Sequence, residues 1–400
     1  MPPEDPADPT GQHRLSGPNV VADRGGSAAS DSGEDRGVPP TQGDPGSRRA
    51  RKERRPTIAD VARHAQTSRG TVSFVINGRP GVAPATRRRV EDAMRVLDWT
   101  PNQLARSLSR ARADALGLVI ARDAASLGSD PFFAPFIAGL ETGMEPYGQS
   151  LLLRFAPDPV AEAAVYGELA AQRRVDGFVL TDLRENDPRA ARIEALGIPA
   201  VTLNPLDVPS PFPAVIRPDE PGVTAAVEFL IGHGHRLIAH VGGPPSYLHA
   251  ARRRTAWQDT MAAHGLPPGP FIASDFTAAG GSSATAALLD LPPGRCPTAI
   301  VYANDLMAVT GMAVAHQRGL CIPHDLSVVG FDDGELSQFL NPPLTTVSNE
   351  AAGWGVVAAQ VLNEVIAGQE PPDRFLPAAR LMVRDSAGPV PPGPAPDLIP

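Results

Sequence analysis

Apolar side chains between residues 57 and 100 recur at the three- and four-residue spacing that is typical of short amphipathic helices. Ile58, Val61, Ala62 and Ala65 fall on one face of a first helix. The same spacing returns twice, with Val72, Val75 and Ile76 in a second segment and Val90, Ala93, Met94 and Leu97 in a third. This stretch is therefore expected to fold as three short helices that share a small apolar core.

Capping and turn residues separate these three segments. Thr57 followed by Asp60 resembles a capping box with Asp in place of the usual Glu, and Ser68 is placed to cap the second helix. An Asn-Gly pair stops that helix, and Pro84 suits the first turn of the third. A three-residue turn between the first two helices indicates a DNA-reading helix-turn-helix, although a generic small helical bundle has the same periodicity.

From residue 115 onward the pattern changes to short apolar runs separated by helical segments. The runs predict buried strands at residues 116–120, 151–153, 177–180, 200–203, 237–241, 299–302 and 328–331. Strands that alternate with helices predict a parallel sheet covered on both faces. Because roughly 285 residues exceed what one such sheet needs, two lobes are expected. The predicted fold class is multidomain, with an all-α helix-turn-helix head and an α/β two-lobed core.

The amino-acid composition helps to place the boundaries between the predicted parts of the chain. Residues 1–47 are rich in Pro, Gly, Ser and Asp without apolar periodicity, so they are expected to be disordered, and a basic run follows at residues 48–55. The predicted parts are a disordered segment that is basic at its end, the helix-turn-helix domain, a hinge helix with linker, and the two-lobed core. They span residues 1–55, 56–101, 102–113 and 114–400, respectively.

Charge is distributed unevenly along the chain. The formal net charge is −8, yet the segment from Arg48 to Arg112 holds sixteen Lys and Arg against five Asp and Glu, a net charge of +11. The remainder therefore carries −19. This asymmetry indicates a cationic module that meets a polyanion such as double-stranded DNA, although a merely solvated basic stretch would have the same composition.

Cysteine usage and the lack of targeting signals favour the cytoplasm. Cys296 and Cys321 cannot form a disulfide framework in a chain of this length. The N-terminal stretch lacks the basic and apolar regions of a signal peptide, and no apolar run approaches the ~18 residues of a membrane span. A cytoplasmic protein without membrane contact is expected.

The sequence offers no complete set of catalytic or metal-binding residues. Gly242–Pro244 lacks the spacing of a dinucleotide site, and Gly280–Ser283 is not a nucleophile elbow. His233, His235 and His240 lie near one another, but no Cys or acidic pattern completes a metal set. No enzyme activity, cofactor or metal is therefore expected.

Motifs in the head and in the core resemble those of one protein family. In the head they are Thr57-Ile58, Asp60-Val61-Ala62, Ala65, Ser68, Thr71-Val72-Ser73, Val75, Asn77, Thr86-Arg87, Pro101-Asn102 and Ala105-Arg106-Ser107-Leu108. In the core they include Asp130-Pro131-Phe132-Phe133, Gly234-His235-Arg236, Ala303-Asn304-Asp305 and Val328–Asp333. Through these motifs the chain resembles the lactose/galactose repressor family, which joins a helix-turn-helix head to a periplasmic-binding-protein-like core. The resemblance implies a homodimer that binds a near-palindromic DNA operator and a small-molecule effector, commonly a carbohydrate.

The head departs from the family pattern at several positions. Gln66 and Thr67 stand where Gly and Val are usual in the turn, and Gly70 replaces the usual Ala of the second helix. Phe74 stands where a base-contacting Arg is common, and Ala83 offers no side-chain oxygen to cap the third helix. The expected operator therefore differs from that of relatives with Arg at position 74.

The resemblance places the second helix in the major groove of DNA. Arg69 is the best direct reader, because its guanidinium can bond both acceptors of a guanine. Thr67 and Ser68 are expected to reach a base or a phosphate, and Phe74 to touch a thymine methyl group or pack against the protein. The residues expected to hold phosphates are Thr71, Ser73, Asn77 and Arg87.

Residues 102–109 resemble the hinge helix of the family. A segment this short is marginal alone, and in the family it forms when two copies pack together in the minor groove. Asn102, Ala105 and Leu108 are the expected DNA contacts. Leu108 would be the wedge that opens a central base step, although an ordinary core leucine fits the same pattern. Specific binding by this mechanism needs two chains.

Candidate ligand residues are expected in the cleft between the two lobes. Arg253, four residues before Trp257, stands where the family keeps a ligand-binding arginine, while Asn304 and Asp332 each follow a predicted strand. A guanidinium, an amide and a carboxylate together suit a polyol. The candidates for an aromatic wall are Phe132, Phe133 and Phe276. The alternatives are a structural ion pair for Arg253 and Asp332, a helix cap for Asn304 and a core position for each Phe.

These features predict a transcriptional repressor whose operator affinity is controlled by a sugar or sugar derivative. The ligand would change the angle between the lobes and thereby the spacing of the paired hinges, and the sequence does not distinguish an inducer from a corepressor. A sugar-binding receptor without a regulatory role shares the core fold, but the basic head and the missing signal peptide count against it. A sugar-modifying enzyme would need an acid and a base that the motifs do not supply.

Overall fold

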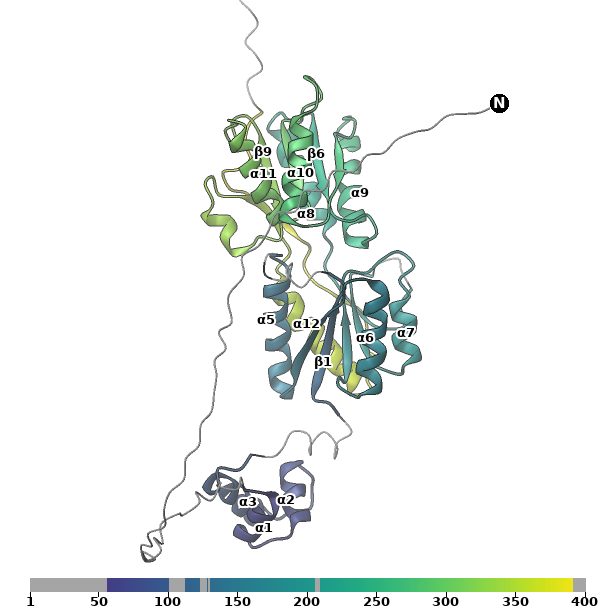
Figure 1. Ribbon diagram of the computed structural model, residues 1–400, viewed down its shortest axis with the longest axis vertical. Coiled ribbons are helices and arrows are strands. Elements are labelled where there is room, and N and C mark those ends of the chain that lie inside the picture. The colour runs from purple at the N-terminus through teal and green to yellow at the C-terminus, as the bar shows by residue number, and fades with distance from the viewer. Residues whose placement is uncertain (1–55, 101–111, 123–127, 129, 206–208, 391–400) are drawn as a thin grey trace, which may run out of the picture. The chain divides into compact units, whose positions relative to one another are not determined.

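The computed structural model describes residues 56–100, 112–122, 128, 130–205 and 209–390. The disorder predicted for residues 1–55 and the hinge contacts predicted for Asn102, Ala105 and Leu108 lie outside these residues. Where the structure describes the chain, it forms a three-helix head and a core of two mainly parallel sheets with helices on both faces (Figure 1). The predicted fold class is therefore confirmed.

The head consists of α1 (Ile58–His64), α2 (Arg69–Ile76) and α3 (Pro84–Val96). Val61, Val72 and Val90, one from each helix, are fully buried and form the centre of a small apolar core. The spacing of apolar residues in the sequence therefore predicted both the helices and the faces that they bury.

Capping hydrogen bonds fix where the first two helices begin. The Asp60 carboxylate accepts the backbone N–H and the hydroxyl of Thr57, at 2.9 and 2.7 Å. The Ser68 hydroxyl accepts the N–H of Thr71 at 3.0 Å at the start of α2. Both predicted caps are confirmed. α3 begins after Ala83, and no side chain of the described residues caps it.

The first sheet of the core is parallel throughout, with strand order β11-β5-β4-β3-β1-β2. Its strands are β1 (Ala115–Ile120), β2 (Ser150–Phe155), β3 (Gly177–Leu180), β4 (Ala200–Leu203), β5 (Ala214–Ile216) and β11 (Arg374–Phe375). One face is covered by α5 (Phe133–Met144), which continues into η2 (Glu145–Tyr147), and by α12 (Ala351–Ile366). The other face is covered by α6 (Pro159–Ala171) and α7 (Arg189–Ala195). This sheet and its helices are called the first lobe.

The second sheet has the order β12-β10-β9-β8-β6-β7 and is parallel except for β12, which runs antiparallel to β10. Its strands are β6 (Ile238–Gly242), β7 (Phe271–Ala273), β8 (Ala299–Tyr302), β9 (Ser327–Phe331), β10 (Thr345–Ser348) and β12 (Arg380–Met382). α8 (Glu220–Gly232) and α9 (Leu248–Ala263) pack on one face, and α10 (Ala278–Leu289) and α11 (Asp305–Gln317) on the other. With η3 (Glu335–Phe339), which follows β9, they form the second lobe.

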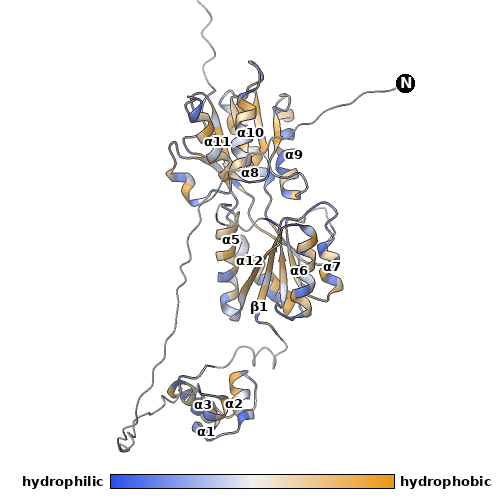
Figure 2. Cartoon of the chain, viewed as in Figure 1, coloured by the Kyte–Doolittle hydropathy of each residue, from blue (hydrophilic) through white to orange (hydrophobic). Residues whose placement is uncertain are grey.

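The strands of both lobes are mainly hydrophobic, as expected for sheets that helices cover on both faces (Figure 2). β3, β4, β6, β8, β9 and β10 are buried along their whole length. Among the helices that the structure describes, none combines the length and the apolar character needed to cross a membrane.

The chain crosses between the lobes after β5, after β10 and between β11 and β12. α12 thereby returns to the first lobe, where the Trp354 indole N–H donates to the Val215 carbonyl at 3.2 Å. Gly139 of α5 and Gly355 of α12 let these two helices approach closely, because a Cβ atom at either position would lie 2.0 or 2.2 Å from a backbone oxygen of the other helix. The C-terminal segments are thus part of both lobes.

Candidate functional site

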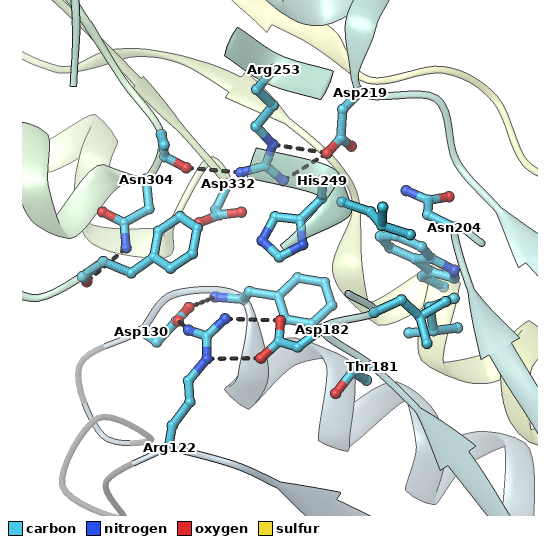
Figure 3. A pocket seen from close by; sticks show the side chains of 17 residues that line it. Arg122, Asp130, Thr181, Asp182, Asn204, Asp219, His249, Arg253, Asn304 and Asp332 are labelled. Atoms are coloured by element: carbon cyan, nitrogen blue, oxygen red, sulfur yellow. Dashed lines mark hydrogen bonds and ion pairs between the residues drawn. The ribbon is translucent and has the colours of Figure 1, made fainter. Parts of the chain in front are cut away.

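Polar side chains of both lobes line one pocket at the carboxyl ends of the parallel strands (Figure 3). In the first lobe, Arg122 follows β1, Asp182 follows β3 and Asn204 follows β4. In the second lobe, Asn304 follows β8 and Asp332 follows β9. Ligands of open α/β sheets bind at this end of the strands, so the pocket is the candidate ligand site.

Arg122 is held by two carboxylates of the first lobe. Its Nε and Nη2 donate to the two oxygens of Asp182, both at 2.8 Å, and its Nη1 donates to Asp130 Oδ2 at 2.9 Å. Burial raises the pKa of Asp130. Burial also opposes the ionisation of Asp182, but the charge of Arg122 outweighs it and holds the pKa of Asp182 below its usual range. These three side chains form a charge-paired wall of the pocket.

Arg253 is clamped on the opposite side, in the second lobe. Its Nε and Nη2 lie 2.8 and 2.7 Å from Asp219 Oδ2, and its Nη1 donates to the Ala303 carbonyl at 2.8 Å. The guanidinium also lies 3.5 Å from the ring centroid of Phe331. The two interpretations of Arg253, ligand residue and structural ion pair, are therefore compatible, because the paired side chain also lines the pocket.

One carboxylate oxygen of Asp219 does not take part in the bonds to Arg253. Within the described part of the chain, its buried Oδ1 has no hydrogen-bond partner, although Asp219 itself is only 3% exposed. Burial raises the pKa of Asp219 despite the neighbouring Arg253. An unpaired buried acceptor is costly, so a donor group from a ligand would stabilise this oxygen.

Asp332 lines the pocket and is close enough to Arg253 and Asp130, one member of each ion pair, to interact with their charges. Its backbone has a φ of 106°, and its Oδ1 accepts the Asn349 side-chain amide at 2.8 Å. Burial raises the pKa of Asp332 well above the usual range, and the nearby carboxylates of Asp130 and Asp305 act in the same direction. Its carboxyl oxygens can accept a hydrogen bond from a ligand hydroxyl group.

Asn304 positions an aromatic side chain of the pocket. Its Oδ1 accepts the N–H of Met307 at 2.9 Å, which caps α11, and its Nδ2 donates to the Phe276 carbonyl at 3.0 Å. Asn304 is thus the helix cap that one of its two interpretations predicts. Phe276 has a left-handed φ of 66°, and this bond helps to hold it at the pocket. Its ring is stacked near His249, with centroids 5.5 Å apart and planes 18° from parallel.

The two neighbouring phenylalanines at the start of α5, the N-cap Phe132 and the first helical residue Phe133, have different environments. Phe132 lines the pocket and packs edge-on against Trp354, with ring centroids 5.8 Å apart. Phe133 is 1% exposed, belongs to the apolar core of the first lobe, and is not part of the pocket lining. The structure thus corrects the expectation for Phe133, because consecutive residues at a helix start point in different directions.

Several pocket residues were not predicted from the sequence, namely Arg122, Asp130, Asp182, Asn204, Asp219 and His249. Burial, followed by the charge of Arg253, lowers the pKa of His249 to about 3, so the imidazole is neutral near pH 7 and has one donor and one acceptor. One signal could have found Arg122 and Asp182: each stands two residues beyond an apolar strand, as Asn304 does.

The balance of charges in the pocket favours an uncharged, donor-rich ligand. Both arginines are already paired with carboxylates, while Asp219 Oδ1 is an open acceptor. Hydroxyl groups can bond such acceptors, and Phe276 and Phe132 can cover the apolar face of a ring. No cluster of three or more His, Cys, Asp or Glu side chains among the described residues could hold a metal ion.

The head exposes the residues that were predicted to read DNA. Arg69 and Phe74 are exposed on α2, with Phe74 43% exposed, and Thr67 is partly exposed in the turn before it. Ser68 is exposed but caps α2, and its hydroxyl lies 2.9 Å from that of Thr71. These side chains therefore lie along α2 and in the turn that precedes it.

The predicted phosphate contacts also have structural partners. The Asn77 amide donates to the Ser73 hydroxyl at 3.3 Å. Arg87 donates from α3 to the carbonyl oxygens of Val75 and Arg79, at 3.4 and 3.3 Å. Arg87 thus connects α3 to the end of α2, and its role toward a phosphate stays a prediction.

Comparison with known proteins covers both the head and the core. Residues 57–102 match the model of the bacterial regulatory proteins, lacI family. Residues 227–387 match that of the periplasmic binding protein-like domain. The head and most of the second lobe therefore each resemble a described family.

Relatives extend this similarity over most of the chain. The HTH-type transcriptional regulator CelR of Thermobifida fusca is 33% identical over 340 residues, or 84% of this chain and 99% of that protein. The HTH-type transcriptional repressor CytR of Escherichia coli strain K12 is 30% identical over 321 residues, or 80% of this chain and 92% of that protein.

Solved structures of transcriptional regulators are similar to this chain over the same extent. The complex of the transcriptional regulator CelR with cellobiose has a TM-score of 0.64 and 31% identity, covering 83% of this chain and 100% of that chain. The lac repressor dimer bound to operator and the anti-inducer ONPF has a TM-score of 0.73 and 29% identity, covering 84% and 100%.

Proposed function

Because this chain belongs to the lacI family of bacterial regulatory proteins, we propose that it is a homodimeric transcriptional repressor controlled by a neutral sugar. The observation that carries the proposal is that one chain contains both a basic helix-turn-helix head and a two-lobed core. The pocket of that core has a buried hydrogen-bond acceptor that lacks a donor within the described residues. A receptor or an enzyme would need the pocket but not the head.

The head is the part that binds the operator. α2 enters the major groove with its capped N-terminus first, and the exposed Arg69 reads a guanine. Two heads in a two-fold symmetric dimer recognise a near-palindromic operator. Asn102, Ala105 and Leu108, in the hinge, contact the minor groove between the half-sites.

The pocket binds the sugar. The CelR structure names cellobiose as its ligand, and lac repressor structures name ONPF and ONPG. In this chain, Asp219 and Asp332 accept sugar hydroxyls, Arg253 orients Asp219, and Phe276 covers the apolar face of the ring. Asn304 acts through Phe276, whose carbonyl it holds.

Contacts between the lobes give the ligand a way to act on DNA binding. The Leu248 N–H donates to the Leu183 carbonyl at 2.9 Å, and the Arg122 guanidinium of the first lobe lies 5.0 Å from the Phe276 ring of the second. A sugar between these groups changes how the lobes meet, and it shifts DNA affinity only if it binds the two lobe arrangements with different affinity.

The first experiment is the selection of duplexes from a random DNA pool with the full-length protein at moderate salt. We expect enrichment of a near-palindrome with a deformable central step. A panel of neutral sugars, sugar phosphates and uronic acids is then added to the protein–operator complex, with a neutral sugar expected to change the affinity. If neither the protein alone nor the protein with any panel member enriches a sequence, the proposal is wrong.

A pair of variants assigns the response to the pocket. Asp332→Ala should keep operator binding and lose the response to the sugar. Glu335→Ala, an exposed carboxylate three residues further on, is the control and should respond like the native protein. A normal response in Asp332→Ala would remove Asp332 from the ligand site.

A further inference from the structure

The exposed face of α2 has a hollow beside Phe74, where the family commonly places a long basic side chain. Gly70 and Phe74 are four residues apart and therefore neighbours on the same helix face. Phe74 is 43% exposed, and Gly70 contributes no side chain beside its ring. Besides Gly70 and Phe74, the residues that line this hollow include Thr67, Ser68, Thr71, Thr86 and Arg89.

Nothing in the packing of the head requires glycine at position 70. A Cβ atom built there would come no closer than 3.6 Å to another part of the described chain, the Ser68 hydroxyl, which is an ordinary contact. Gly70 lies inside α2, where alanine is the more favourable residue. The free space beside Phe74 therefore opens outward, toward whatever α2 binds.

Arg79 holds the Phe74 ring at the surface. Its guanidinium lies 5.6 Å from the ring centroid, within the range of a cation–π interaction. The Arg79 N–H also donates to the Phe74 carbonyl at 2.9 Å, across the turn at Gly78. The ring thus stands beside a positive charge, on the part of the chain that carries a net charge of +11. This charge suits a polyanionic partner, and an apolar protein surface would not require it.

We propose that Gly70 and Phe74 form an apolar notch that receives the 5-methyl group of a thymine in the major groove, with Arg79 as the positioning residue of the ring. A phenyl ring cannot hydrogen bond to base edges, and among the unmodified bases only thymine offers a methyl group in the major groove. This inference rests on the proposed function, since α2 must lie in that groove.

The test removes single methyl groups from the selected operator. Each thymine is replaced in turn by deoxyuridine, which lacks only the 5-methyl group, and the affinity of the full-length protein is measured by fluorescence anisotropy. We expect one symmetry-related thymine per half-site whose replacement weakens binding about fourfold, the value expected for one buried methyl group. 5-Bromodeoxyuridine at that position should restore binding, because bromine is similar in size to methyl.

Variants identify the side chains that form the notch. Phe74→Ala should bind the thymine and deoxyuridine operators equally, and Gly70→Ala, which fills the notch, should also lose most of the discrimination. Arg79→Ala should weaken the discrimination, and Arg79→Lys should restore part of it. Val96→Ala, which truncates an exposed apolar side chain of α3, is the control and should discriminate like the native protein.

The outcomes separate this inference from the proposed function. Two results would contradict binding of a thymine methyl group in the notch while leaving the repressor function unaffected. In the first, the protein binds the operator but no deoxyuridine substitution weakens binding. In the second, Phe74→Ala still discriminates between the thymine and deoxyuridine operators. If Phe74→Ala instead weakens self-association of the protein in sedimentation and leaves methyl discrimination intact, the ring belongs to a protein contact and the inference is also overturned. Failure to bind any duplex would overturn both.

Discussion

The head and the pocket differ in how their candidate functional residues relate to the fold. On the head, Arg69 and Phe74 are exposed and contribute little to the packing. In the pocket, Arg253 and Asn304 are 7% and 2% exposed, and their bonds hold an ion pair and a helix start in place. Function and stability are thus largely separable in the head and combined in the pocket.

The difference follows from what each region binds. DNA is a large polyanion that meets the protein at its surface, so its readers must remain outside the core. A small ligand must be enclosed to gain affinity, so its partners are buried and must satisfy one another when no ligand is present. Substitutions at the two places should therefore differ in their effect on stability, and the following predictions run from the largest such effect to the smallest.

Removal of the partner of a buried arginine should have the largest effect. Asp219→Ala leaves the Arg253 guanidinium buried without its carboxylate and should lower the free energy of unfolding by about 3–5 kcal/mol, as measured by urea denaturation of the full chain. Asp290→Ala breaks the exposed ion pair with Arg318 and is the matched control, with little change expected. Equal losses in the two variants would contradict the view that pocket pairs carry stability.

A buried carboxyl group beside the pocket should make stability depend on pH. Asp305 accepts hydrogen bonds from the Ser337 hydroxyl at 2.6 Å, from the Gly334 N–H at 2.8 Å and from the Thr346 hydroxyl. Burial nevertheless raises its pKa to about 6. Because this value lies above that of the unfolded chain, the folded state binds the proton more tightly, and stability is lost as pH rises through 6.

The variant Asp305→Asn removes this titration. Between pH 5 and pH 7.5 the free energy of unfolding of the native protein should therefore fall relative to that of the variant, by roughly 1–2 kcal/mol. If the free energies of unfolding of the two proteins change with pH in parallel over this range, Asp305 stays ionised throughout and the prediction is wrong. The exposed residues of the head give no reason to expect a similar change there.

Removing a helix cap from the head and adding one should change its stability by moderate amounts of opposite sign. Ser68→Ala removes the side chain that caps α2 and should cost about 1 kcal/mol. Ala83→Ser offers α3 a cap where none of the described side chains supplies one, and should gain a similar amount. Hydrogen exchange of the α2 and α3 amides in the full chain measures both. Unchanged protection in both variants would show that packing alone fixes these helix starts.

Substitution of the predicted guanine reader should have the smallest effect on stability. Arg69→Ala should change the free energy of unfolding by no more than about 0.5 kcal/mol. It should weaken binding to the selected operator by about 1–3 kcal/mol, because a bidentate base contact is lost, and leave sugar affinity intact. A parallel loss of sugar affinity would show that the head and the pocket are not separable.

The sequence predicts those elements whose structure is decided by one local pattern. Apolar runs marked β1 and β9, and helical spacing marked the head. β7 and β11, with three and two residues, carry no such pattern and form because neighbouring strands pair with them. Phe133 was misplaced because the sequence did not fix which of two adjacent aromatic residues faces the pocket.

The candidate site was predictable only in part, for a related reason. Arg253, Asn304 and Asp332 were found through strand ends and a family resemblance. Arg122 and Asp182 lie 60 positions apart and meet because β1 and β3 are neighbours in the first sheet. Such a charge pair depends on strand order, which the spacing of apolar residues does not reveal.

The return of α12 to the first lobe has a consequence for synthesis of the chain on the ribosome. The first lobe starts at Ala115, but its apolar core stays open until residues up to Ile366 have emerged, after nearly all of the second lobe. The close approach of Gly139 and Gly355 is thus among the last contacts to form. A nascent chain that has reached only Ser348 holds a complete head attached to an unclosed first lobe.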